Sequence, residues 1–526
     1  MNSFIATEIQ VVFILMIVTV VAVIARRARL PYTVALVVVG LGLAFQTRLQ
    51  QIELTPELVL ALFLPPLVFE AAFHLQFREL REDLWPLLTL AVPGVIVSTL
   101  LVGGLLSFTG VLALPVALLF GALISATDPV AVVATFKALG APRRLATLME
   151  GESLFNDGTA IVVFQIVLGL VLAGELSLTE GIFEFFTESL GGIGVGILLG
   201  YVFAFFIDSI DDYLIETTLT TVLAYGSYLL AHELLHVSGV LAVVTAGLIN
   251  GNIGLRGMSP TTKIVLFNFW EYAAFLANSF VFLLLGLSVE WEQLIRYLPS
   301  VLGAVLAVLV ARAITIYGLG TLIRRFKRDI PGGYLHVMVW GGLRGAVSMA
   351  LALSLPFSNR IPRAELLAMT FGVVLFTLLV QATTTPLLLR RLGFAGGQRF
   401  TGNYERLQGE LLALRAARRR LDHLREEGAL VPHAWKTVTD ELEQREQLVL
   451  GEVEALLTAH PELQNDVVML ARSEALRAQR AALTSLASEG LLSNDVISEL
   501  QAEVDEALQD LHSPPHNAQS SPATSA

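Results

Sequence analysis

Long runs of apolar residues recur from the N-terminus to about residue 390. A run of roughly 20 apolar residues can cross a bilayer as a helix, whereas a β-barrel would show short segments of alternating polarity. We therefore predict an all-α polytopic membrane protein with about thirteen transmembrane helices. The candidate spans lie near residues 9–25, 31–46, 56–75, 85–108, 113–136, 145–173, 180–207, 214–232, 237–251, 262–288, 298–322, 333–355 and 365–389.

Arginine and lysine are concentrated in alternate loops between these spans. Because cytoplasmic loops carry the excess of basic residues, we expect the N-terminus outside and the C-terminal tail in the cytoplasm. The basic loops hold Arg26, Arg27, Arg29, Arg78, Arg81, Lys137, Arg143, Arg144, Arg256, Lys263, Arg324, Arg325, Lys327, Arg328, Arg390 and Arg391. The opposite loops hold Arg48, Arg296, Arg360 and Arg363.

The pattern changes after the last span. Leucines such as Leu407, Leu411 and Leu414 follow a helical spacing among Ala, Glu and Arg, which predicts a small helical cytosolic extension. We divide the chain into a transmembrane domain (1–393), a helical tail (394–511) and a disordered C-terminus (512–526) that has almost no apolar residues. A regulatory tail, a dimer brace and an inert tail all fit this pattern.

Composition and charge exclude several classes of function. Of the 526 residues 55% are hydrophobic and 15% charged, against about 25% charged in soluble proteins, which excludes an ordinary soluble enzyme. The net charge of −12 lies mostly in the tail and argues against a nucleic-acid partner. The chain has no cysteine, so disulfides, thiolate metal sites and cysteine nucleophiles are excluded.

A few charged residues lie within the apolar spans. Each costs at least ~2.5 kcal/mol at bilayer depth, so each needs a partner, a water-filled cavity or a function. They are Glu70, Asp128, Glu152, Asp157, Arg312 and Arg344, with Glu271 near a helix end.

Residues 125–136, SATDPVAVVATF, predict a broken helix at mid-span. Pro129 cannot donate to the carbonyl of Ser125, and a residue before proline, here Asp128, avoids helical geometry. The break frees backbone carbonyls beside the Thr127 hydroxyl and the Asp128 carboxylate, as in the ion sites of secondary transporters. A simple proline kink is the alternative.

The next span contains EGESLFNDGTAIVVF at 150–164. Ser153 and Asp157 share one helix face, with Asn156 beside them and Glu152 on an adjoining face. A hydroxyl, an amide oxygen and a carboxylate suit a dehydrated hard cation. The alternative is that these groups only hydrogen-bond helices together.

Two further segments carry buried charge. In FLPPLVFEAAFHL, Glu70 is either an acid near the ion or a structural group bonded to a neighbouring helix. In WGGLRGAVSMALAL, glycines permit a helix break around Arg344, which cannot lose its proton and needs a carboxylate. We expect Glu152 to be that partner in a structural ion pair, and we assign no partner to Arg312.

The motifs TDPVAV, GESLFNDG, FLPPLVFEAAF and GGLRGA closely resemble those of the monovalent cation:proton antiporters, the family of NhaP-type bacterial Na+/H+ antiporters and eukaryotic Na+/H+ exchangers. The resemblance covers about residues 5–392, including LHVSGVLAVVTAGL and FWEYAAFLANSFVFLLLG. It implies a homodimeric plasma-membrane (inner-membrane) transporter, not an enzyme, with no cofactor. It also implies inverted-topology repeats with broken crossing helices, and a core domain that slides against a dimerisation domain.

The resemblance also implies residue roles. The ion (Na+, Li+ or H+) would be held by Asp157 with Ser153, by Asp128 with Thr127, and at greater distance by Glu70. A Glu152–Arg344 bridge would stabilise the core. The Asn156–Asp157 pair marks the electroneutral branch, so we expect one cation to exchange for one proton, for pH and sodium homeostasis. Proton and cation would compete for the Asp157 carboxylate.

Three functions are alternatives to Na+/H+ exchange. A K+/H+ exchanger and a proton-coupled channel fit the same residues, because ligand type does not separate Na+, Li+ and K+. HELLH at 232–236 matches the zinc-protease pattern HExxH, but no third ligand is recognisable. We therefore expect no zinc site and take His232 and His236 as a coincidence.

Overall fold

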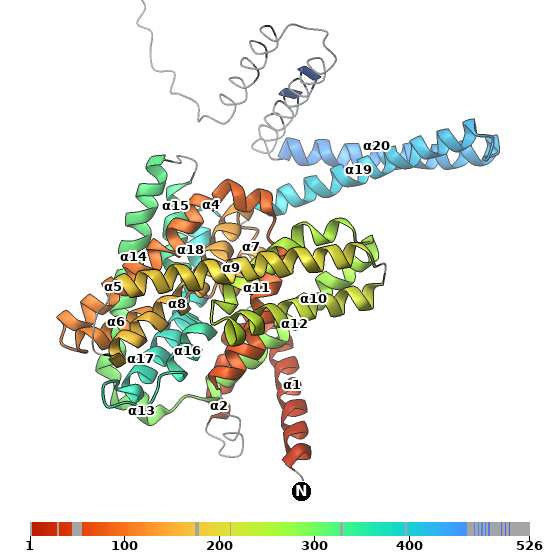
Figure 1. The fold of residues 1–526 in the computed structure, drawn as a ribbon. Coiled ribbons are helices and arrows are strands. Elements are labelled where there is room, and N and C mark those ends of the chain that lie inside the picture. Colours follow the sequence, from red (N-terminus) through yellow and green to blue (C-terminus); the bar gives the residue numbers. More distant parts are fainter. Residues whose placement is uncertain are drawn as a thin grey trace, which may run out of the picture. The chain divides into compact units, whose positions relative to one another are not determined.

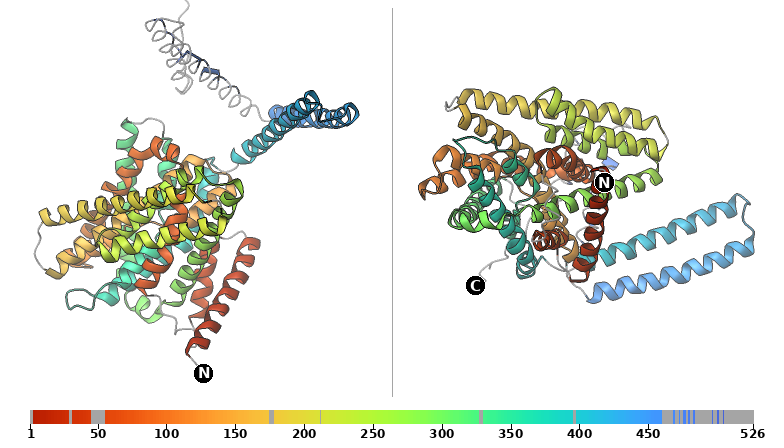
Figure 2. Two further views of the ribbon diagram at one scale, coloured as in Figure 1. Left: turned by 45° about the vertical axis from the view of Figure 1, so that its right-hand side comes forward. Right: turned by 90° about the horizontal axis from the view of Figure 1, so that it is seen from below.

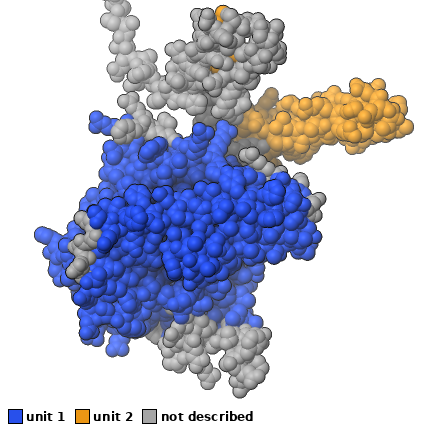
Figure 3. Space-filling view, viewed as in Figure 1, with its two compact units in different colours: residues 1–396 blue, residues 397–526 orange. Residues whose placement is uncertain are grey.

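The structure is a computed structural model that describes residues 3–28, 31–44, 55–173, 178–210, 212–326, 330–394 and 397–459, with isolated positions beyond 459. It divides into two compact units, residues 1–396 and 397–526 (Figure 3). The described residues form helices, and their one β-bridge joins Ser358 to Ile361. This confirms the predicted all-α class.

Figure 1 shows the helices of the first unit in chain order. They are α1 (Ser3–Ala28), α2 (Tyr32–Leu43), η1 (Leu58–Phe63), α3 (Leu64–His74), α4 (Phe77–Ala91), α5 (Pro93–Phe108), α6 (Leu114–Leu123), α7 (Val130–Leu139), α8 (Arg143–Ala173), α9 (Leu178–Asp208), α10 (Tyr213–Leu229), η2 (Leu230–Leu234), α11 (Gly239–Asn252), η3 (Gly254–Arg256), α12 (Pro260–Leu287), α13 (Trp291–Arg296), α14 (Leu298–Phe326), α15 (Gly332–Gly341), α16 (Ala346–Leu353), α17 (Arg363–Phe376), η4 (Thr377–Ala382) and α18 (Thr383–Arg391).

In the described residues, seven helical stretches are long and apolar enough to cross a membrane, or eight when the bent pair α15 and α16 is taken as one span. Two of the seven join consecutive elements: α4 with α5, and α17 with η4 and α18. Shorter apolar helices include α2, α6, α7 and α11. Each predicted span contains helical residues, so the multi-pass class is confirmed. The figure of about thirteen crossings stays a prediction.

Helix α9 exposes large apolar side chains at the surface of the first unit. Helices α9 and α10 lie side by side in both views of Figure 2. Phe183 and Phe205 of α9 are about three-quarters exposed, at 74% and 75%. Exposed aromatic side chains on this scale suit contact with lipid.

Close helix contacts build the interior around α3, α11 and α12. Trp270 of α12 is buried and its ring centre lies 4.4 Å from that of Phe69 on α3. Gly251 of α11 packs directly on α3, because a Cβ there would lie 2.1 Å from the carbonyl oxygen of Phe73.

Two helices are interrupted within the first unit. Helix α6 ends at Leu123 and α7 begins at Val130, with no helical turn between Ser125 and Pro129. Helix α15 ends at Gly341 and α16 begins at Ala346, with a bend of 40°. The break predicted at Asp128 and Pro129 is confirmed, and it begins earlier than Pro129 alone requires.

The second unit contains the helices α19 (Gly397–Glu426) and α20 (Pro432–Ala459). They pack through a small apolar cluster of Leu407, Leu411 and Val449. Ion pairs across the hairpin join Arg415 to Glu446, Arg418 to Glu443 and Arg445 to Glu410. The tail is therefore helical where it is described, and residues 512–526 lie outside the described residues.

Candidate functional site

The two interruptions cross each other. The backbone N–H of Asp128, in the α6–α7 break, donates to the carbonyl of Leu343, in the α15–α16 break, at 2.9 Å. The N–H of Arg344 donates to the hydroxyl of Thr377 at 3.1 Å. Backbone groups that helix hydrogen bonds would have used are therefore partly satisfied by the opposite break, for Asp128, and by η4, for Arg344.

Asp128 lies at the start of α7. Its Oδ1 accepts a hydrogen bond from the N–H of Val130 at 3.0 Å, and a carboxylate at a helix N-terminus is favoured by the helix dipole. Gly345 lies against the other oxygen, since a Cβ on Gly345 would be 2.2 Å from Asp128 Oδ2. Only a glycine fits at this contact.

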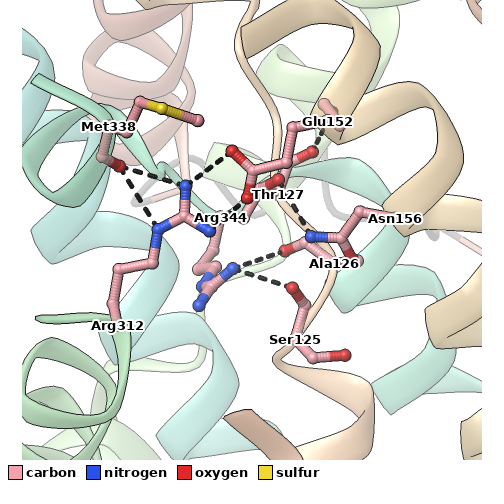
Figure 4. Close-up of polar contacts among 9 residues, drawn as sticks. Ser125, Ala126, Thr127, Glu152, Asn156, Arg312, Met338 and Arg344 are labelled. Carbon is pink, nitrogen blue, oxygen red and sulfur yellow. Dashed lines mark hydrogen bonds and ion pairs between the residues drawn. The ribbon is translucent and has the colours of Figure 1, made fainter. Parts of the chain in front are cut away.

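Helix α8 holds the break through Thr127 (Figure 4). The Ser153 hydroxyl donates to the Thr127 carbonyl, and Asn156 Nδ2 donates to Thr127 Oγ1 at 3.2 Å. All three side chains are buried. The structure thus brings Thr127 of the α6–α7 break together with Ser153 and Asn156 of α8.

Asp157 follows on the same helix. Its carboxylate interacts electrostatically with Asp128 and Arg344. Among the described residues no group donates a hydrogen bond to its side chain, while Asp128 has the N–H of Val130. Two acidic side chains from two elements therefore lie near the crossing, and of the two only Asp128 accepts a hydrogen bond from a described residue.

The predicted partner of Glu152 is wrong. Glu152 is paired with Arg312 of α14: both terminal nitrogens of the guanidinium donate to the carboxylate, one of them at 2.9 Å. Arg312 also donates to the carbonyl of Met338 through Nε and Nη2, at 3.3 and 3.0 Å. Both charged side chains are buried. The sequence analysis did not identify Arg312 as the cation of this pair.

Arg344 bonds to backbone oxygens. Its Nη1 donates to the carbonyls of Ser125 and Ala126, at 2.9 and 3.1 Å, within the α6–α7 break (Figure 4). These carbonyls lie beyond the last turn of α6, where helix partners end. Arg344 therefore holds the crossing together by hydrogen bonds to freed carbonyls.

Glu70 belongs to a separate acidic group. On α3, its Oε1 lies 3.3 Å from Nδ1 of His74, one turn later. Its other electrostatic neighbours are Lys137, Glu271 and Glu150. Glu70 thus stands away from the contacts around Thr127, in keeping with the more distant position expected for it.

The HELLH segment does not have the geometry of a zinc protease. Glu233 lies in η2, which ends at Leu234, while His236 lies beyond it with a left-handed φ of 51°. The two histidines therefore do not share a helical face, which the motif requires. In the described part of the chain no three His, Asp or Glu side chains are grouped for a metal ion.

Residues 12–391 match the family of transmembrane sodium/hydrogen exchangers. The chain is 45% identical over 400 residues to the Na+/H+ antiporter ApNhaP of Aphanothece halophytica, covering 75% of each chain. It is 37% identical over 507 residues to the Na+/H+ antiporter NhaG of Bacillus atrophaeus, covering 94% of this chain and 95% of the relative.

The fold has a counterpart of known structure. The sodium proton antiporter MjNhaP1 from Methanocaldococcus jannaschii matches with a TM-score of 0.62 at 23% identity, over 74% of this chain and 99% of the other. The family itself is identified by the match over residues 12–391 and by the two relatives. The chain belongs to the sodium/hydrogen exchangers, secondary transporters of the monovalent cation:proton antiporter family.

Proposed function

We propose that this protein exchanges one Na+ or Li+ for one proton, without net charge movement, and that Asp157 carries the exchange. The observation that supports this most is the difference between neighbours on α8. Asn156 uses its amide N–H to hold Thr127, whereas Asp157 has no hydrogen-bond donor among the described residues. One exchangeable carboxylate beside a neutral amide favours electroneutral exchange.

Cation and proton would compete for that carboxylate. A bare charge near the bilayer centre is costly, so the site would reorient only when a proton or a cation neutralises it. The oxygens of Asp128, Thr127 and Ser153 would complete the shell, since Na+ and Li+ accept oxygen ligands. Obligatory exchange follows from this competition.

We propose that access alternates by an elevator motion of a core domain against a dimerisation domain in a homodimer. The exposed aromatic face of α9 offers apolar surface that a second copy or lipid would cover. Glu70, with its acidic neighbours, would attract the cation before it reaches Asp157. The orientation proposed for the inner membrane, with the N-terminus outside, rests on the distribution of basic loops.

The test is transport in everted vesicles. We expect Asp157→Asn to abolish Na+-dependent proton release while the protein still inserts. Asp212→Asn is the matched control, because Asp212 caps α10 away from the site and its loss should leave exchange intact. Exchange that persists in Asp157→Asn would refute the assignment.

The same assay tests stoichiometry and selectivity. With wild-type protein across pH 6–9, we expect Na+ and Li+ to release protons at rates that do not change when the membrane potential is clamped. A rate that follows the potential would contradict one-for-one exchange. A response to K+ alone would indicate a K+/H+ exchanger of the same fold.

A further inference from the structure

A small cavity lies next to the crossing, lined by residues of α4, α5, α8, α14 and the two breaks. Its volume has room for about one water molecule. Arg312 and Arg344 bring two guanidinium groups to its wall. Its lining is Leu90, Gly94, Val95, Ser98, Ser125, Asn156, Arg312, Thr315 and Arg344.

Three polar atoms of this lining have no hydrogen-bond partner among the described residues. They are Oδ1 of Asn156, Nε of Arg344 and Oγ1 of Thr315. The three residues are only 1–3% exposed. More than nine in ten buried polar groups are hydrogen-bonded in proteins, so three such atoms around one polar cavity indicate a ligand that bonds to them.

The hydroxyl of Thr315 differs from those of other buried helical threonines. A threonine within a helix commonly returns its hydroxyl to a carbonyl in the preceding turn. Thr135 and Thr159 do so, at 3.0 and 2.9 Å. Thr315 lies within the long helix α14 and does not make that bond. Its hydroxyl is therefore available to the cavity.

We propose that this cavity holds a resident water molecule. Nε–H of Arg344 donates to the water, which donates to Oδ1 of Asn156 and to Oγ1 of Thr315. Three hydrogen bonds are typical of a buried water. The guanidinium groups at the wall disfavour a cation. An anion is disfavoured because chloride is wider than water and because the charge of Arg312 is already paired with Glu152.

The water would fix the orientation of the Asn156 amide. With Oδ1 bonded to water, Nδ2 is directed to Thr127, the residue whose carbonyl and hydroxyl lie at the proposed ion site. Thr315 is then a positioning residue that acts from α14 through the water. This functional part rests on the proposed exchange activity, whereas the presence of the water does not.

A crystal structure of the wild-type protein grown in bromide tests the water directly. We expect a solvent peak within hydrogen-bonding distance of the three atoms and no anomalous signal. An anomalous bromide peak would assign the cavity to an anion, and a cavity without density would leave it dry. Either result overturns the proposal.

Transport by Thr315→Val tests the functional part. This isosteric change removes one hydrogen bond, so the apparent KM for Na+ should rise about two- to tenfold at an unchanged maximal rate. Thr315→Ser should restore the wild-type KM. Thr135→Val is the control, because that hydroxyl bonds within its own helix.

An unchanged KM in Thr315→Val, or the same rise in Thr315→Ser, would refute the positioning role. The outcome is separable from the assignment of Asp157. Exchange that survives Asp157→Asn refutes the proposed function, yet leaves the crystallographic water peak unaffected.

Discussion

Glu152 and Arg312 form a buried ion pair, and breaking such a pair by removing one partner costs about 3–5 kcal/mol. We expect Arg312→Met to lower the thermal stability of the detergent-solubilised protein strongly, because it leaves the Glu152 carboxylate buried and unpaired. In a double-mutant cycle, Glu152→Gln should show a large coupling energy with Arg312→Met.

The same cycle with Arg344→Met is the control. Arg344 donates to the carbonyls of Ser125 and Ala126, so its coupling with Glu152→Gln should be smaller. A larger coupling energy to Arg344 than to Arg312 would restore the pairing expected from the sequence.

Gly345 gives a second prediction at this scale. In Gly345→Ala the new methyl group would lie 2.2 Å from Oδ2 and 2.5 Å from Cβ of Asp128. The two breaks must therefore move apart. We expect the protein to insert but to lose most Na+-dependent proton release in vesicles. Gly104→Ala on α5 is the control, because nothing lies within 4 Å of its added Cβ; near-normal transport in Gly345→Ala would contradict the close contact.

The sequence identifies the buried charges but not how they pair. Arg312, on the continuous helix α14, reaches both the Glu152 carboxylate and the carbonyl of Met338. Arg344 lies in a break, where neighbouring carbonyls are free to accept. The sequence predicts a break around Arg344, but the choice between Arg312 and Arg344 as partner of Glu152 depends on how distant helices pack.

At the scale of the element, the helical hairpin of the second unit is held by two kinds of contact, buried apolar packing and exposed ion pairs, whose contributions can be measured separately. Val449 is fully buried against Leu407 and Leu411, and removing buried methyl groups costs about 1 kcal/mol or more. Val449→Ala should therefore reduce hydrogen-exchange protection along α19 and α20.

Arg418→Ala should change that protection little. The Arg418–Glu443 pair is about half exposed, with side chains 43% and 47% accessible, and exposed pairs contribute roughly 0–1 kcal/mol. If Arg418→Ala exposed the hairpin amides more than Val449→Ala, ion pairs would be its main support.

The interrupted helices show which part of a helix break can be predicted from the local sequence. Pro129 predicts a break at its own position, and glycines predict one near Arg344. The non-helical stretch nevertheless starts at Ser125, because Arg344 and Ser348 supply donors to the carbonyls of residues 125 and 126. Those donors come from more than 200 residues away, beyond the reach of sequence pattern.

At the scale of the molecule, the lack of cysteine permits a direct test of orientation. Asn359 lies in the exposed turn between α16 and α17, and Gln444 is exposed on α20. A membrane-impermeant maleimide added to intact cells should label Asn359→Cys and should label Gln444→Cys only after the cells are opened. The reverse order of labelling would invert the proposed topology.

The crossing also restricts which motions the molecule can make. Sliding one break along the other would separate the N–H of Asp128 from Leu343, and the guanidinium of Arg344 from the carbonyls of Ser125 and Ala126. Each buried group left without a partner costs about 1–3 kcal/mol, so shear within the crossing is strongly resisted. We therefore expect both broken helices to move together as one rigid body, and the surfaces that slide during transport to lie elsewhere in the transporter.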